Sequence, residues 1–311
     1  MRFKVEINQQ QAYPVFHLID TNTGCIAEIF AFGGILNAFH IPLNGNTFNC
    51  IDGFSTVEEA QESITSAFKS AKISPFVCRL HNGTYHLNGE SYTIQKNYLG
   101  KHALHGLLYD AVYKLESINE SETAASILLT CHYAKNDAGY PFAFDISLRW
   151  ELSPNNTLSI TTSISHQNKD AIPYADGWHP YFTLGGPVDQ YFLQFDSDTQ
   201  LEFDADLIPT GKKIKDNRFI EKYPLNEIFL DNSFELAPNG KCVLSNDQFE
   251  LKVIPDENYP ILQVYTPDHR NSIAIENLSG APDNFNNGIG LLMLVPHNEY
   301  QFKTSYQLTT L

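Results

Sequence analysis

Short stretches in which apolar and polar residues alternate recur along almost the whole chain. Alternation with a period of two is typical of strands that bury one face, and turn-forming Gly, Asn and Pro residues separate these stretches. The pattern predicts roughly 15–20 strands. The clearest are expected at residues 3–7, 15–19, 25–32, 35–41, 126–134, 142–152, 157–165, 249–255, 261–267, 272–278 and 300–311.

Helical periodicity is convincing only over residues 56–68, where Ser55 or Thr56 can cap the first turn and glutamates follow. A β-hairpin is expected over residues 84–94, because Asn88-Gly89 is a favourable two-residue turn. Many short strands with few helices predict an all-β protein, a large antiparallel β-sandwich. No Pro-, Gly- or Ser-rich linker divides the chain, so a single domain over residues 1–311 is expected.

Composition and charge narrow the function classes. The chain is 42% hydrophobic and 13% aromatic, which is enough for a sizeable core. A net charge of -16 without a Lys/Arg cluster argues against nucleic-acid partners. The start of the chain resembles no signal peptide and no apolar run is long enough to span a membrane, so a cytoplasmic protein without membrane association is expected. Five scattered cysteines without C-x-x-C spacing predict neither a disulfide framework nor a zinc site.

Glu276 is the first candidate for chemistry. It comes late in an apolar run, IAIEN, just before a polar loop that contains Ser279, Pro282 and Asp283. A carboxylate that leaves a strand into such a loop is placed to meet a ligand, although an ordinary surface glutamate fits the same pattern. Partial burial would raise its pKa towards neutrality and suit it to act as a general base.

Histidines in unusual surroundings are the next candidates. His179 lies in the aromatic segment DGWHPYF, where Pro180 interrupts any regular sheet. It is either a core histidine held by the backbone or one poised to exchange protons, and the neighbouring Trp178 and Tyr181 could stack on a sugar ring. His105 precedes a glycine that permits close approach of the backbone.

Three further polar residues have more than one interpretation. His102 forms an H-x-x-H spacing with His105, but this spacing on a loop is weak evidence, and no metal is expected. Arg79 could form a salt bridge or make bidentate contacts with hydroxyl or phosphate groups. Asp231 could be a turn residue or an acceptor for ligand hydroxyls.

Taken in order, these segments resemble the aldose 1-epimerase family, the galactose mutarotase-like proteins, over nearly all of the chain. DGWHPYF resembles the family's H-P-Y-F motif, and IAIENLSGAPDNFNNG resembles its E…P-D-A-x-N block. Weaker similarities come from CRLHNGTYHLNGESYTI (an R-x-x-x-G strand and hairpin), NYLGKHALHG (N-x-L-H-G-G), LIPTG (P-T-G) and LDNSF (the substrate aspartate).

The resemblance implies a β-supersandwich fold and the interconversion of α and β anomers of a hexose without a cofactor. By position, Glu276 would be the base that deprotonates the C1 hydroxyl, and His179 the acid that protonates the ring oxygen. His105 would lie against the ring, and Arg79 and Asp231 would bind its hydroxyls. The expected partner is a small sugar, and the chain would be a monomer or a homodimer.

Departures from the family pattern leave the substrate open. Leu107 replaces a glycine of H-G-G, and residues 277–279 and 297–298 also differ, in loops that would line the pocket. One alternative is a hexose-6-phosphate 1-epimerase, which needs a cationic pocket that Lys101 and His102 could help to form. The other is a non-catalytic sugar-binding module, which would not need an acid and base together.

Overall fold

Antiparallel sheets dominate the computed structural model, which describes residues 1–43 and 45–311. The largest sheet has nine strands in the order β12 (Lys114–Glu120), β13 (Ala125–Tyr133), β14 (Phe144–Ser153), β15 (Thr157–Ser165), β29 (Glu299–Thr310), β25 (Phe249–Pro255), β24 (Cys242–Ser245), β19 (Phe192–Phe195) and β22 (Tyr223–Pro224). A five-stranded sheet contains β1 (Phe3–Asn8), β2 (Val15–Asp20), β3 (Cys25–Phe30), β4 (Leu36–Leu43) and β5 (Asn46–Asn49).

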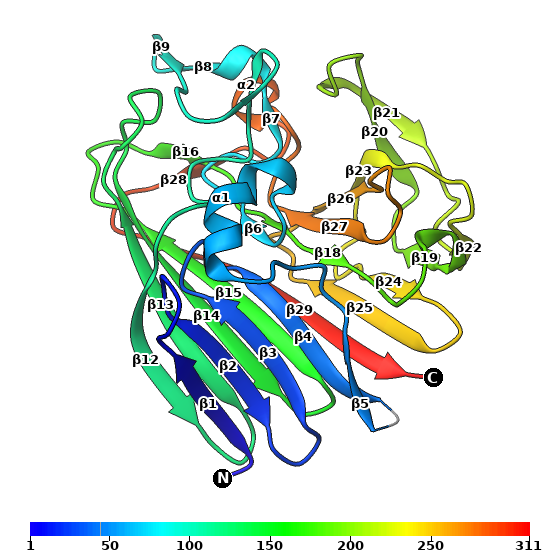
Figure 1. Cartoon of the computed structure of the whole chain (residues 1–311). Helices are drawn as coiled ribbons and strands as arrows, with labels where there is room; N and C mark the ends of the chain where they lie inside the picture. The colour runs from blue at the N-terminus through cyan, green and yellow to red at the C-terminus, as the bar shows by residue number, and fades with distance from the viewer. Residues whose placement is uncertain (44) are drawn as a thin grey trace.

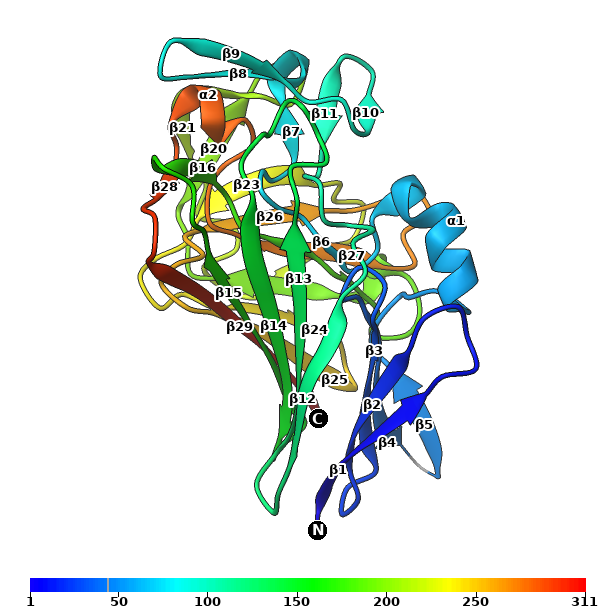
Figure 2. The same ribbon diagram turned by 90° about the vertical axis from the view of Figure 1, so that its left-hand side faces the viewer.

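These two sheets face each other in a sandwich, with β1 and β2 packed against β12, β13 and β14 (Figures 1 and 2). Alternate residues of β14 are buried, which is why Trp150 lies in the core while its neighbours Arg149 and Glu151 do not. The indole N–H of Trp150 donates to the carbonyl oxygen of Gly34 at 3.2 Å. The antiparallel β-sandwich expected from the alternating pattern is therefore confirmed.

A second group of strands lies beyond one end of the sandwich (Figure 1) and supplies most of the candidate site. Its six-stranded sheet has the order β18 (Tyr181–Phe182), β27 (Ile273–Leu278), β26 (Ile261–Tyr265), β23 (Asp231–Glu235), β20 (Thr199–Phe203) and β21 (Pro209–Lys215). The smaller sheets are β10 (Tyr98–Leu99), β11 (His102–Leu104) and β7 (Arg79–Leu80); β6 (Ala71–Lys72) with β17 (Trp178–His179); β16 (Ile172–Tyr174) with β28 (Leu292–Leu294); and β8 (Thr84–Leu87) with β9 (Glu90–Thr93).

The local predictions for the helix and the hairpin are confirmed. Helix α1 (Val57–Ala67) begins after Thr56, whose hydroxyl accepts the Glu59 N–H at 3.1 Å, and it ends at Phe68 in a left-handed conformation. Asn88 and Gly89 join β8 to β9 with positive φ angles, as a type I′ turn requires.

The remaining helical elements are short. They are α2 (Asn284–Asn287) and two 3₁₀ turns, η1 (His81–Gly83) and η2 (Val188–Gln190). In the part of the chain that the structure describes, no helix is long and apolar enough to cross a membrane.

Candidate active site

A cavity of about 600 Å³ opens beside the six-stranded sheet and the end of α1. Its lining contains six of the seven residues expected from the sequence to form a site: Arg79, His105, His179, Tyr181, Asp231 and Glu276. They come from segments as distant as β7 and β27, so the fold brings together side chains that lie almost 200 residues apart. A volume of this size is typical of sites for small molecules.

Glu276 lies on the wall of the cavity, in the fully buried strand β27, with only 2% of its surface exposed. The interpretation of this residue as an ordinary surface glutamate is therefore wrong. Its Oε1 atom lies 3.4 Å from Nε2 of His179. Burial raises the pKa of Glu276 well above its ordinary value, the negative charge of Asp231 adds to this effect, and Arg79 opposes it.

His179 enters the cavity from β17, which pairs with β6 before Pro180 ends the strand. Its ring stacks on Tyr181 with 5.1 Å between centroids and meets the ring of His105 edge-on at 4.8 Å. Burial lowers the pKa of His179 to about 4, so the free imidazole is neutral near pH 7. The alternative of a core histidine held only by the backbone does not fit, because its Nε2 atom faces a carboxylate.

His105 owes its position to an unusual stretch of backbone. Its φ angle is 58°, and its N–H donates to the carbonyl oxygen of Cys78 at 2.8 Å. At Gly106 a Cβ atom would lie 2.2 Å from the carbonyl oxygen of Ser74, which confirms the close approach that this glycine predicted. The centroid of its ring lies 4.6 Å from that of Phe68. Burial lowers the pKa of His105 well below its ordinary value.

Arg79 and Asp231 add a positive and a negative group to the cavity lining. No carboxylate oxygen of the described residues lies within 4.0 Å of the Arg79 guanidinium, which leaves it available to a ligand. The Asp231 carboxylate accepts a hydrogen bond from Gln263 at 2.7 Å, and Gln263 accepts one from Ser233. Burial raises the pKa of Asp231, whereas Arg79 and Gln263 lower it.

The prediction that Trp178 stacks on a sugar must be corrected, because this residue does not line the cavity. It is buried against Trp150 at 5.4 Å between ring centroids, and the Lys72 ammonium lies 4.6 Å from its ring. Successive residues of a strand point to opposite faces, so His179 faces the cavity and Trp178 the core. The expected stacking of Trp178 on a sugar is thus replaced by a role in packing.

His102 is not paired with His105 in the way that a metal-binding H-x-x-H pair would be. Its Nδ1 atom accepts the N–H of Asn82 at 3.2 Å, and its Nε2 atom lies 3.8 Å from Asp206. The Lys101 ammonium forms an ion pair with the Asp206 carboxylate, with 2.7 Å between Nζ and Oδ2.

A buried polar network behind the cavity was missed by the sequence analysis. The Asp176 carboxylate accepts hydrogen bonds from the Lys72 ammonium at 2.5 Å, from the hydroxyls of Tyr259 and Tyr174 at 2.5 and 2.8 Å, and from Ser74 at 3.2 Å. The Asp176 N–H donates to the hydroxyl of Ser279 at 2.8 Å. The network therefore ties the segment before His179 to the segment after Glu276. Burial lowers the pKa of Lys72 to about 8, although the negative charge of Asp176 raises it.

Comparison with known proteins identifies a family for this chain. The family model described as aldose 1-epimerase matches residues 16–307. The uncharacterized protein YihR of Escherichia coli is 27% identical over 241 residues, which cover 75% of this chain and 77% of that protein. The aldose 1-epimerase of Streptococcus thermophilus is 27% identical over 203 residues, which cover 63% of this chain and 57% of that protein.

Solved structures share the fold at lower sequence identity. The galactose 1-epimerase of Lactobacillus acidophilus superposes with a TM-score of 0.84 at 18% identity, covering 100% of this chain and 99% of that one. A galactose mutarotase-like protein of Clostridium acetobutylicum gives a TM-score of 0.85 at 15% identity, with 99% and 98% coverage. These similarities establish a galactose mutarotase-like fold.

Proposed function

Because this chain belongs to the aldose 1-epimerase family, we propose that it interconverts the α and β anomers of a hexose, with Glu276 as general base and His179 as general acid. One observation carries the proposal: Oε1 of Glu276 and Nε2 of His179 lie 3.4 Å apart on the wall of a cavity of about 600 Å³. A buried carboxyl and an imidazole in contact are the groups that proton transfer near neutral pH requires.

The proposed reaction consists of two coupled proton transfers. Glu276 takes the proton of the C1 hydroxyl while His179 gives a proton to the ring oxygen, and the bond between C1 and the ring oxygen breaks. The open-chain aldehyde rotates about its C1–C2 bond, and the ring closes on the other face with both transfers reversed. Both oxygens are attached to C1, so an acid and a base that touch each other can each reach one of them.

The protonation of the pair fits this scheme. Burial disfavours charge on either group, so without a ligand a protonated Glu276 beside a neutral His179 is the favoured arrangement. The reactive arrangement, a carboxylate beside an imidazolium, contains the same single proton. Sugar hydroxyls that donate to the carboxylate, together with the positive charge of Arg79, would stabilise the reactive form without uptake of a proton from solvent.

The other lining residues would position the sugar. Arg79 and Asp231 offer donors and acceptors for hydroxyl groups, and the Asp231 carboxylate is already oriented by Gln263. Tyr181 supports the His179 ring from one side, and His105 meets it edge-on from another. Correct orientation adds to the rate because the reacting groups need no further alignment.

The two lysines near the cavity, unlike Arg79, are already paired with carboxylates, and this favours an unphosphorylated sugar over the hexose-6-phosphate alternative. The Lys101 ammonium is bound by Asp206 at 2.7 Å, and the Lys69 ammonium by Asp52 at 2.6 Å. A phosphate would have to compete with these carboxylates for each lysine. A hexose needs no such exchange.

Anomeric equilibration tests the proposal directly. Freshly dissolved α-D-glucose, α-D-galactose and glucose 6-phosphate are followed by polarimetry or proton NMR, with the wild-type protein, with Glu276→Gln and without protein. Acceleration of a free hexose by the wild type and not by the variant is the expected result. Acceleration of the phosphosugar alone would favour the alternative epimerase, and no acceleration by a folded protein would favour a sugar-binding module.

A further inference from the structure

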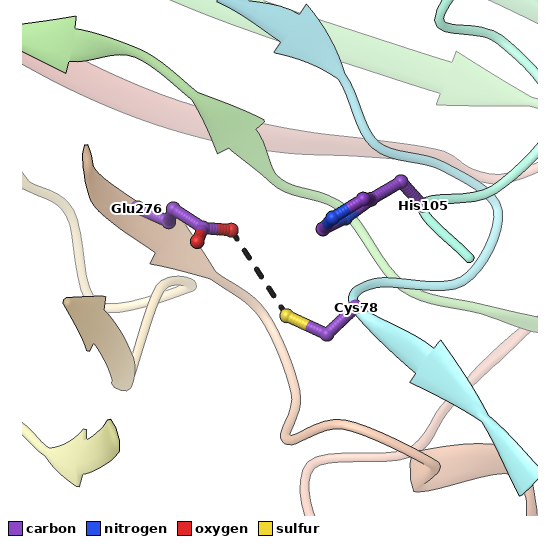
Figure 3. A group of neighbouring side chains, drawn as sticks. All are labelled: Cys78, His105 and Glu276. Carbon is purple, nitrogen blue, oxygen red and sulfur yellow. Dashed lines mark hydrogen bonds between the residues drawn. The ribbon is translucent and has the colours of Figure 1, made fainter. Parts of the chain in front are cut away.

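Cys78 places a thiol beside the proposed base, and the proposed mechanism gives it no task. Its Sγ atom lies 4.0 Å from Oε2 of Glu276, and Figure 3 shows the His105 ring directed towards the same carboxylate. One potential ligand atom from each of these three side chains lies within 4.8 Å of the other two, and all three side chains are buried. Burial raises the pKa of the Cys78 thiol well above its ordinary value, so without a metal the thiol is protonated and uncharged.

We propose that Cys78, His105 and Glu276 bind a zinc ion, and that zinc bound there inhibits the proposed epimerase. Thiolate, imidazole and carboxylate are the usual protein ligands of zinc, at about 2.0–2.3 Å from the metal. Ligand atoms around a tetrahedral zinc ion lie about 3.5 Å apart, so side-chain movements of about 1 Å would close the set. Three protein ligands leave a fourth position open to the cavity.

The imidazole of His105 provides independent support for a ligand at this place. Only 8% of the residue is exposed, and its Nδ1 atom has no hydrogen-bond partner among the described residues. Buried polar atoms without a partner are uncommon in folded proteins and often mark a place for an ion or a ligand. Its backbone is also fixed to that of Cys78 by the hydrogen bond of 2.8 Å, which sets the spacing of two of the ligands in advance.

Zinc binding and sugar turnover would exclude each other. Zinc binding releases two protons to solvent, one from the Cys78 thiol as the Zn–S bond forms and one from the Glu276 carboxyl group. The Glu276 carboxylate then gives a lone pair to the metal instead of to the C1 hydroxyl proton. Inhibition therefore rests on the proposed function, whereas zinc binding itself does not.

Cobalt(II) titration tests the binding, because a cobalt–thiolate bond produces a charge-transfer absorption that other ligands do not. Reduced wild type, Cys78→Ser and Cys131→Ser are compared without sugar. Cys131 is the matched control, since it is a half-buried thiol on β13, outside the proposed set of ligands. We expect one equivalent of cobalt to produce the band in wild type and Cys131→Ser but not in Cys78→Ser, and zinc to displace it. The zinc affinity of Cys78→Ser, measured by calorimetry, should fall at least about 10-fold.

Three results would overturn the proposal: no metal binding by the wild type, an equal band in Cys78→Ser, or loss of the band in Cys131→Ser. If Cys78→Ser does not fold, X-ray absorption at the zinc edge of the Cys131→Ser protein decides instead. One sulfur ligand among nitrogen and oxygen ligands is expected, and a shell without sulfur would refute the site.

Inhibition is measured separately from binding. Zinc should slow the anomeric equilibration catalysed by the wild type, and Cys78→Ser should be less sensitive relative to its own zinc-free rate. A protein that binds zinc as described but accelerates no sugar would contradict the proposed function and leave the zinc site intact. A wild type that binds zinc and keeps its full rate would contradict the inhibition.

Discussion

Replacement of Lys72 by Met isolates the energetic role of the network behind the site. Lys72 and Asp176 form an ion pair at 2.5 Å in which neither side chain has any exposed surface. Met retains most of the apolar stem of lysine and removes its charge, so the carboxylate of Asp176 keeps hydroxyl donors but loses its counter-ion. Removing one partner of a buried ion pair costs ~3–5 kcal/mol.

The expected loss converts into a shift of the melting temperature. An unfolding entropy of ~2.1 cal/mol/K per residue gives ~0.65 kcal/mol/K for a chain of 311 residues, so a loss of ~3–5 kcal/mol lowers Tm by ~5–8 °C.

Thermal unfolding at pH 7, followed by calorimetry or circular dichroism, measures this shift. Lys213→Met is the matched control, since the Lys213 ammonium lies 2.7 Å from Glu235 but 57% of the lysine side chain is exposed. A surface pair of this kind contributes ~0–1 kcal/mol. In the double variant Lys72→Met/Asp176→Asn most of the loss should be recovered, because no buried charge remains. A Tm for Lys72→Met no lower than that of the control, or a double variant no more stable than the single one, would refute the reasoning.

Other changes test the site and its surroundings. Glu276→Gln and His179→Asn should each lower the rate of anomeric equilibration about 10²-fold or more, and near-wild-type turnover by either variant would remove that residue from its proposed role. Trp178→Phe should lower Tm with little change in KM, because Trp178 packs in the core; a several-fold rise in KM at unchanged Tm would restore it to the binding site. Arg270 holds the pKa of Asp189 at about 2, so the stability that this pair provides is present above pH ~4 and is lost as the pH falls through about 2. The Tm difference between wild type and Arg270→Met should narrow over that range, and a constant difference would contradict the linkage.

The sequence predicted those features that depend on neighbouring residues. The alternation of buried and exposed positions in β14 and the Thr56 cap of α1 arise within a few residues of chain, and both are visible in the sequence. The motifs around His179 and Glu276 also identified the segments that line the cavity. A family resemblance and local periodicity were therefore enough to predict the fold class and most of the candidate residues.

The tertiary structure decided which way each side chain points and which distant residues it contacts. The sequence could not assign Trp178 to the core and His179 to the cavity, because that choice depends on which side of β17 meets the sandwich. Lys72 and Asp176 are 104 residues apart, and Cys78 and Glu276 are 198 residues apart, so no local pattern connects them. Burial shifts the pKa values of Lys72, Cys78 and Glu276, and it makes a counter-charge necessary for the buried Lys72–Asp176 pair. Burial is a property of the assembled sheets, since the low-dielectric surroundings of each group are built by strands distant in the chain.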